Sequence, residues 1–384
     1  MWTYVGGAVL SIALVAQTVE TRACQTPDSQ SPGSTPGPSP VPPSPVFTTR
    51  DGVRFRVETV LTDLEIPWSL AFAPDGRLFL TERPGRVRIV NLSTLTSEVA
   101  LTLNVFAQGE AGLLGLALDP GFAQNHFVYL YYSAPSGGGA VNRIERYREV
   151  AGRLGEAAVV LDGIPASTIH DGGRVRFGPD GFLYATAGDA SNTSFAQDVT
   201  SLAGKILRIT PTGMSPPGNR FSTPVFTYGH RNPQGIDWHP TTGDLWEAEH
   251  GPTGNDEINV IQSGSNYGWP VIQGSATAAG MLAPVVFYSS TIAPSGISFY
   301  RSQLIPQFAN DLFVAALRGA HLTRITTDAR RVVTQERLLD GTYGRLRDVV
   351  SGPDGYLYFC TNNRDGRGTP MSGDDRLLRI VPAS

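Results

Sequence analysis

One histidine, one aspartate and several arginines in this sequence lie beside short β-rich runs, where they could do chemistry. His170 comes directly before 171–173, where Gly172 and Gly173 let a ligand approach the backbone. A neutral imidazole is the usual proton acceptor near pH 7, and Asp189 is an acid that could orient it. A single histidine in a loop is more often a surface hydrogen-bonding group, so its position relative to other residues must decide its role.

Four arginines hold equivalent positions at the ends of such runs: Arg231, Arg318, Arg345 and Arg347. A single arginine is best explained by pairing with a neighbouring acid, as Arg347 could with Asp348. Several guanidinium groups around one cavity are costly unless an anion shares the space, and guanidinium matches carboxylate oxygens well. If the fold brings the four together, they predict a site for a small polyanionic ligand.

The segment 251–257 is rich in oxygen ligands. Gly251 and Pro252 precede Asn255, Asp256 and Glu257, and calcium readily takes backbone carbonyls and carboxylates. An Asx-type turn explains these residues equally well. The sequence has no HExxH, EF-hand, P-loop, GxGxxG or GxSxG motif, so nothing supports a nicotinamide, nucleotide or α/β-hydrolase site.

A repeated hairpin predicts the elements that position these residues. Residues 69–82, 174–187 and 348–361 each contain two β-rich runs around Pro-Asp-Gly, a strong turn signal. Looser copies cover 113–132, 235–249 and 296–317. A third short strand follows each copy, at 86–90, 143–147, 205–209, 257–261, 321–325 and 376–380.

This repeat predicts an all-β fold, a six-bladed β-propeller of four-stranded antiparallel blades over residues 47–384. A period of roughly 56 residues is near that of known propellers and leaves room for a fourth strand. The run 51–61 precedes the first hairpin and is expected to join the last blade, closing the ring and removing sheet edges. Residues that enter first strands and leave second strands then meet at one mouth of the central channel, which brings His170, Asp189 and the arginines together.

Seven segments, in the same order, resemble the glucose/sorbosone dehydrogenase family, and within it the aldose sugar dehydrogenases are most similar. The resemblance extends over about residues 53–382. The segments are IPWSLAFAPDGRLFLTER, GEAGLLGLALDP, HDGGRVRFGPDGFLYATAGD, GHRNPQG, EHGPTGNDEINVI with NYGWP, LFVAALRG, and RLRDVVSGPDG.

The resemblance implies a quinoprotein that oxidises aldose sugars to lactones by hydride transfer to pyrroloquinoline quinone (PQQ) beside calcium. His170 matches the family's general base and Asp189 its supporting acid, and Arg231 is assigned to both the catalytic and the cofactor group. Gly251 and Pro252 match the carbonyls that hold calcium. The positions that match cofactor contacts are Glu110, Arg231, Asn232, Arg318, Arg345 and Arg347. Glu257 and the carbonyl of Tyr267 resemble part of a second, structural calcium site.

Departures from the family pattern concern the cofactor and the sugar. Glu110 stands where the best-known glucose enzymes have glutamine, and its charge near a tricarboxylate is unfavourable unless it is protonated or paired. Arg318 replaces a lysine, which keeps the charge but changes the contact. Ile169 replaces an acid and no tryptophan precedes 291–294, so glucose specificity is not implied. The alternatives are a non-catalytic carbohydrate- or protein-binding propeller and a calcium-dependent lactonase.

The N-terminal residues predict export. Residues 1–24 are expected to be a signal peptide, because 5–16 is apolar but too short to span a bilayer. Cys24 could instead be lipidated, although Thr21 and Arg22 fit that pattern poorly. Residues 25–46 contain eight prolines and are expected to be an extended linker. The mature protein would be periplasmic, cell-surface or secreted, with an electron acceptor that the sequence does not identify.

The charge of the chain argues against nucleic acid as a partner. The net charge is −4 and no basic segment stands out, whereas nucleic-acid binding depends on clustered Lys and Arg. The two cysteines, Cys24 and Cys360, form neither a disulfide framework nor a zinc spacing.

Overall fold

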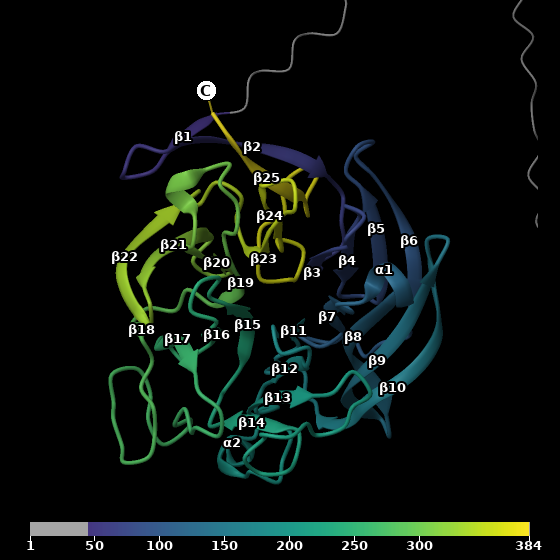
Figure 1. Cartoon of the computed structure of the whole chain (residues 1–384), viewed down its shortest axis with the longest axis vertical. Coiled ribbons are helices and arrows are strands. Elements are labelled where there is room, and N and C mark those ends of the chain that lie inside the picture. Colours follow the sequence, from purple (N-terminus) through teal and green to yellow (C-terminus); the bar gives the residue numbers. More distant parts are fainter. Residues whose placement is uncertain (1–44, 384) are drawn as a thin grey trace, which may run out of the picture. The chain divides into compact units, whose positions relative to one another are not determined.

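The computed structural model describes residues 45–383, which form six antiparallel sheets around a central channel (Figure 1). The predicted six-bladed propeller is confirmed. The first five blades consist of β3 (Pro67–Phe72), β4 (Leu78–Glu82), β5 (Arg86–Asn91) and β6 (Thr96–Thr102); β7 (Leu113–Leu118), β8 (Phe127–Ser136), β9 (Gly139–Val150) and β10 (Arg153–Pro165); β11 (Val175–Phe177), β12 (Leu183–Ala187), β13 (Lys205–Ile209) and β14 (Val225–Tyr228); β15 (Pro233–Trp238), β16 (Leu245–Glu249), β17 (Asp256–Ile261) and β18 (Val286–Tyr288); and β19 (Pro294–Phe299), β20 (Leu312–Ala316), β21 (His321–Asp328) and β22 (Arg331–Leu338).

The sixth blade joins the two ends of the described chain. Its sheet has the order β1-β2-β25-β24-β23. These strands are β23 (Leu346–Ser351), β24 (Leu357–Thr361), β25 (Leu377–Pro382), β2 (Arg54–Leu61) and β1 (Val46–Thr48). The predicted closing strand is therefore β2, which pairs antiparallel with β25 from Phe55↔Pro382 to Leu61↔Leu377. A fifth strand, β1, adds to this blade, and the sequence did not predict it.

The first strand of each blade lines the channel. Along the ring, each of β3, β7, β11, β15, β19 and β23 contacts the next, and β23 contacts β3. Second strands such as β4, β12 and β24 are buried along their whole length, because both faces of the sheet pack against neighbouring blades. The Pro-Asp-Gly turns end in Gly76, Gly181 and Gly355 at φ values of 86°, 78° and 89°, which favour glycine.

Helices contribute little to the fold. Within residues 45–383 they are α1 (Phe122–Asn125), α2 (Ser194–Gln197) and the 3₁₀ helix η1 (Pro306–Phe308), and none is long enough to cross a membrane. The predicted signal peptide, Cys24 and nearly all of the predicted linker lie outside the described residues.

Candidate active site

Loops that enter first strands and leave second strands meet around a cavity of about 330 Å³ at one end of the channel. We call it the arginine cavity. It brings together eight of the twelve site residues predicted from sequence: Glu110, His170, Arg231, Gly251, Pro252, Arg318, Arg345 and Arg347. Asp189 and Asn232 lie directly behind its wall. Asp189 is hydrogen-bonded to His170, and Asn232 is hydrogen-bonded to Glu110. Glu257 and Tyr267 line a smaller hollow beside it.

The predicted pair of His170 and Asp189 is formed. His170 Nδ1 lies 2.8 Å from Asp189 Oδ1, and this carboxylate is almost fully buried. Because Nδ1 is engaged by Asp189, Nε2 is the nitrogen left to meet a substrate proton. The backbone of His170 can lie this close to the loop that carries Asp189 because residue 188 is a glycine. A Cβ at Gly188 would overlap the carbonyl of His170.

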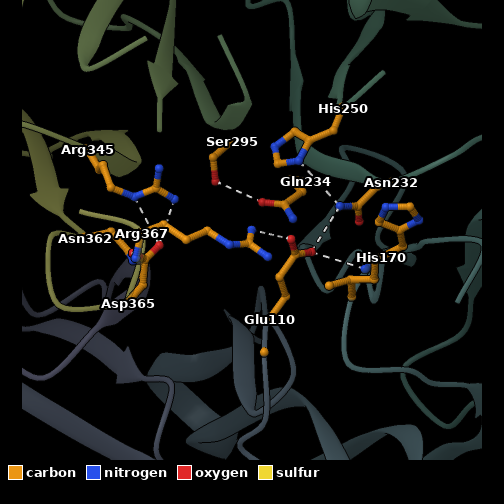
Figure 2. A network of polar contacts seen from close by, with 12 residues as sticks. Glu110, His170, Asn232, Gln234, His250, Ser295, Arg345, Asn362, Asp365 and Arg367 are labelled. Atoms are coloured by element: carbon orange, nitrogen blue, oxygen red, sulfur yellow. Dashed lines mark hydrogen bonds and ion pairs between the residues drawn. The ribbon is translucent and has the colours of Figure 1, made fainter. Parts of the chain in front are cut away.

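Glu110 is paired, and its partner is a residue that the sequence analysis missed (Figure 2). Its Oε1 accepts a hydrogen bond from Arg367 Nη1 at 2.6 Å, and its Oε2 accepts the backbone N–H of His170 at 3.1 Å and Nδ2 of Asn232 at 3.4 Å. Burial alone would raise the pKa of Glu110, but the charge that His250 takes up only in acid and the Arg367 guanidinium outweigh burial and hold this pKa at about 2. Glu110 is therefore an ionised, compensated carboxylate near pH 7.

His250 is a neutral member of the same network. Burial lowers the pKa of His250 to about 3. Its Nδ1 is 3.5 Å from Asn232 Nδ2, and its Nε2 is buried without a hydrogen-bond partner in the described chain. An imidazole that accepts at Nδ1 carries its proton at Nε2, so His250 offers a spare donor to a ligand.

Two of the five arginines that line the arginine cavity are ion-paired. Arg367 pairs with Glu110, and Arg345 places Nη2 2.7 Å from Oδ2 of Asp365 (Figure 2). Both pairs are neutral as units, so neither adds net charge to the cavity.

Arg347 has no carboxylate partner among the described residues. Its Nη1 donates to Gln234 Oε1 at 2.7 Å and its Nε donates to Asn362 Oδ1 at 3.0 Å. The alternative in which Arg347 pairs with Asp348 is wrong, because Asp348 Oδ2 accepts from Arg174 Nη1 at 2.9 Å. Burial lowers the pKa of Arg347 to about 10, so it stays charged at neutral pH.

Arg231 and Arg318 also lack ion-pair partners within residues 45–383. Arg231 Nη1 donates to the carbonyls of His250 (3.1 Å) and Gly251 (2.7 Å), and its buried Nε has no acceptor. Burial lowers the pKa of Arg231. Arg318 is exposed at the cavity rim. Three guanidinium charges in one cavity are thus uncompensated, which suits an anionic ligand and not a sealed surface.

The predicted calcium positions lie in oxygen-rich surroundings. A Cβ added at Gly251 would overlap the carbonyls of Gly254 and Asn255, so several carbonyl oxygens crowd this turn. Such a cradle fits a hard cation.

Glu257 lies in a second acidic cluster that the sequence analysis recognised only in part. Ligand atoms of His230, Glu247 and Glu249 lie within 4.8 Å of one another. Burial, reinforced by the charge of Glu249, raises the pKa of Glu257 to about 8. Oε1 of Glu247 has no partner among the described residues. Buried carboxylates that have no arginine or lysine partner within residues 45–383 fit a cation site better than a packing role.

The sequence analysis also missed the residues that hold the base from behind. Trp269 donates its indole N–H to Asp189 Oδ2 at 2.8 Å. It belongs to the NYGWP segment, which gave the resemblance without indicating a contact to the base. Arg367 could have been suspected from its place in the loop that leaves β24, since such loops were expected to reach the channel mouth.

Known proteins are similar to this chain over most of its length. The family model described as Glucose / Sorbosone dehydrogenase matches residues 64–379. Aldose sugar dehydrogenase YliI of Escherichia coli (strain K12) is 33% identical over 353 residues, which cover 85% of this chain and 93% of that protein. A solved putative oxidoreductase (glucose dehydrogenase) from Thermus thermophilus is 45% identical with a TM-score of 0.80, covering 85% of this chain and 100% of that one. The PQQ-bound form of aldose sugar dehydrogenase from Streptomyces coelicolor is 38% identical with a TM-score of 0.79, covering 85% and 98%.

Proposed function

Because the chain belongs to the glucose/sorbosone dehydrogenase family, we propose that it is a quinoprotein dehydrogenase that oxidises the anomeric hydroxyl of aldose sugars to lactones. PQQ and calcium are the proposed cofactors. The observation that carries the proposal is the set of three guanidinium groups without ion-pair partners in the described chain, facing the same cavity as His170. Three such charges match the three carboxylates of PQQ.

The residues of the arginine cavity have the chemistry to hold PQQ. Arg231, Arg318 and Arg347 would meet its carboxylates, and the unpartnered buried donor Nε2 of His250 would meet a further oxygen. The carbonyls of Gly251 and Pro252 would hold calcium, and Glu257 with the Tyr267 carbonyl would belong to a structural ion. When bound, PQQ supplies the acceptor for a hydride and calcium supplies a Lewis acid.

The protein's own part in the reaction is proton removal and orientation. His170 Nε2 takes the proton of the anomeric hydroxyl as the C–H electrons leave that carbon, so the sugar loses one proton and one hydride and becomes a lactone. Asp189 holds the imidazole in the tautomer with the proton on Nδ1 and stabilises the imidazolium that forms. Glu110 fixes the backbone of His170, which sets the direction of the ring.

Reconstitution tests the proposal. The purified protein with added PQQ and calcium should reduce an artificial dye in the presence of an aldose, and His170→Ala should lower turnover by at least ~100-fold. Quinone affinity, measured by titrating the metal-loaded protein and following its absorbance, should change little in this variant. Turnover equal to the unmodified protein would exclude the role of His170. Absence of calcium-dependent quinone uptake would favour a binding propeller, and lactone hydrolysis without quinone would favour a lactonase.

A further inference from the structure

We infer that Trp269 is a positioning residue, whose indole N–H fixes the carboxylate of Asp189 and through it the imidazole of His170. This inference rests on the proposed role of His170 as the base. Trp269 Nε1 lies 2.8 Å from Asp189 Oδ2, and Asp189 Oδ1 lies 2.8 Å from His170 Nδ1. The backbone N–H of Ser191 donates to the same Oδ1 at 2.9 Å.

The three donors leave the Asp189 carboxylate no freedom to rotate. One oxygen serves the imidazole and Ser191, and the other serves the indole. If the indole N–H were lost, Oδ2 would become a buried carboxylate oxygen without its donor, and the carboxylate could turn to find another. The imidazole would turn with it, because its Nδ1 proton follows the oxygen that accepts it.

Trp269 is itself held by the backbone and by a glutamine on α2. Gln197 Nε2 donates to the Trp269 carbonyl at 2.6 Å, and the Trp269 backbone N–H donates to the Gly229 carbonyl at 2.9 Å. Gln197 and Asn266 exchange two further hydrogen bonds, at 3.0 and 2.8 Å. The indole therefore meets Asp189 from a fixed backbone, which is what a positioning residue needs.

A buried lysine anchors the segment that carries Gln197. Nζ of Lys205, the single lysine of the chain, donates to the carbonyls of Phe195 (2.6 Å), Ala196 (3.2 Å) and Ala203 (2.6 Å). Burial lowers the pKa of Lys205 to about 7, yet three carbonyl acceptors favour the ammonium form, since a neutral amine has two N–H groups. A continuous set of contacts thus runs from Lys205 on β13 to His170.

The ring of Trp269 has a second task, separate from that of its N–H. The guanidinium carbon of Arg231 lies 5.3 Å from the indole centroid, a cation–π distance. Loss of the indole N–H alone should therefore slow proton transfer to His170. Loss of the whole ring should also disturb Arg231, which is proposed to meet the quinone.

Replacement of the indole by a phenyl ring tests the inference. In Trp269→Phe, kcat should fall about 10-fold because the base is misaligned, while KM for the sugar and the dissociation constant of PQQ stay within about 2-fold because no ligand contact is lost. Trp269→Ala should lower kcat at least as much and also weaken PQQ binding, through Arg231.

A matched control is available on β16. Trp246 is fully buried, and its Nε1 has no hydrogen-bond partner among residues 45–383. Trp246→Phe therefore makes the same change in volume without removing a hydrogen bond, and its kcat should equal that of the unmodified protein. Equal losses of kcat in Trp269→Phe and Trp246→Phe would overturn the positioning role.

A spectroscopic measurement separates positioning from folding defects. In the protein without quinone, the NMR signal of the proton on His170 Nδ1 should move in Trp269→Phe in the same direction as in Asp189→Asn, and should not move in Trp246→Phe. If Trp269→Phe does not fold, Gln197→Leu loosens Trp269 from the other side and should shift the same signal. An unmoved signal in the folded variants contradicts the inference. The proposed function fails separately, if His170→Ala keeps full turnover.

Discussion

The two ends of the central channel both contain arginines, but the groups around them differ. At one end, the arginine cavity has three guanidinium groups without ion-pair partners in the described chain. At the other end, a larger cavity of about 530 Å³ is lined by residues such as Arg176, Asp237 and Arg301, near the ends of the first strands. There, Asp237 accepts from Arg176 at 3.1 Å, from both terminal nitrogens of Arg301 at 2.9 Å, and from the backbone N–H of Phe299 at 2.7 Å.

This comparison shows that cavity size alone does not identify the proposed reactive end, and that the pairing of the arginines distinguishes the two cavities. Asp237 hydrogen-bonds both guanidinium groups through its two oxygens, so this cluster keeps an excess of one positive charge, against three in the arginine cavity. The smaller cavity holds three guanidinium groups without a carboxylate partner in the described chain. It also leaves Nε of Arg231 and Nε2 of His250 without acceptors, and it places a histidine–aspartate pair beside them. Unsatisfied groups are costly in a folded protein and persist where a ligand completes them.

Arg174 separates the two ends. It extends from the loop before β11, is almost fully buried, and hydrogen-bonds Asp348 on β23, Ser69 on β3 and the carbonyl of Gln234 on β15. Its guanidinium carbon lies 4.4 Å from the ring centroid of Trp68. One charged side chain thus ties together first strands from around the ring.

The largest effect is expected from breaking this central pair. Asp348→Ala leaves the buried Arg174 without its carboxylate and should lower the free energy of unfolding by ~3–5 kcal/mol. Asp365→Ala, beside the arginine cavity, should lower the free energy of unfolding by less, because Arg345 can meet water or a ligand. Chemical denaturation of both variants measures the two losses in free energy of unfolding. Equal losses would show that Arg345 is as inaccessible to water as Arg174.

An intermediate effect should distinguish the arginines of the two ends. Arg347→Gln removes an uncompensated cation and should weaken PQQ binding by ~100-fold, the size of a lost charge-assisted contact to a ligand carboxylate. Arg301→Gln, the same change at the satisfied end, should leave PQQ affinity unchanged. Fluorescence or absorbance titration measures both; comparable losses would mean that the ends are not functionally different.

The smallest effects should come from the paired arginine at the reactive end, and they have opposite signs. Arg367→Gln leaves the ionised Glu110 facing the quinone and should weaken PQQ binding by about 10-fold. Glu110→Gln frees the Arg367 charge and should strengthen binding by a similar factor. The double variant should bind nearly as the unmodified protein does, because a neutral pair has been replaced by a neutral pair. Weaker PQQ binding in Glu110→Gln, or a double variant that binds as weakly as Arg367→Gln does, would contradict the compensation when measured by the same titration.

The sequence predicted the blades well because strand and turn chemistry is local. Pro-Asp-Gly turns at fixed spacing mark the hairpins, and the apolar pattern of 51–61 fits a strand that closes the ring. β1 was missed because three residues next to a proline-rich stretch carry too little pattern. The convergence of the arginines followed from the repeat alone.

Side-chain partners were harder to predict because they depend on loops that meet in space. Glu110 and Arg367 are 257 residues apart, and no local signal links them. Arg347 and Asp348 are adjacent, but neighbours on a strand point to opposite faces, so Asp348 turns to Arg174 and Arg347 to the cavity. Adjacency in sequence therefore suggested the wrong pair.

The pairing of β2 with β25 also affects when the protein becomes competent to bind its cofactor. A ribosome makes β2 early and β25 last, so β2 has only the three-residue β1 as a partner until nearly the whole chain has been synthesised. The blade completed by that final step is the one that presents Arg345 and Arg347. An incomplete chain, or one clipped at either end of the propeller, would therefore lack the assembled cavity, which makes quinone binding a natural check on full-length synthesis.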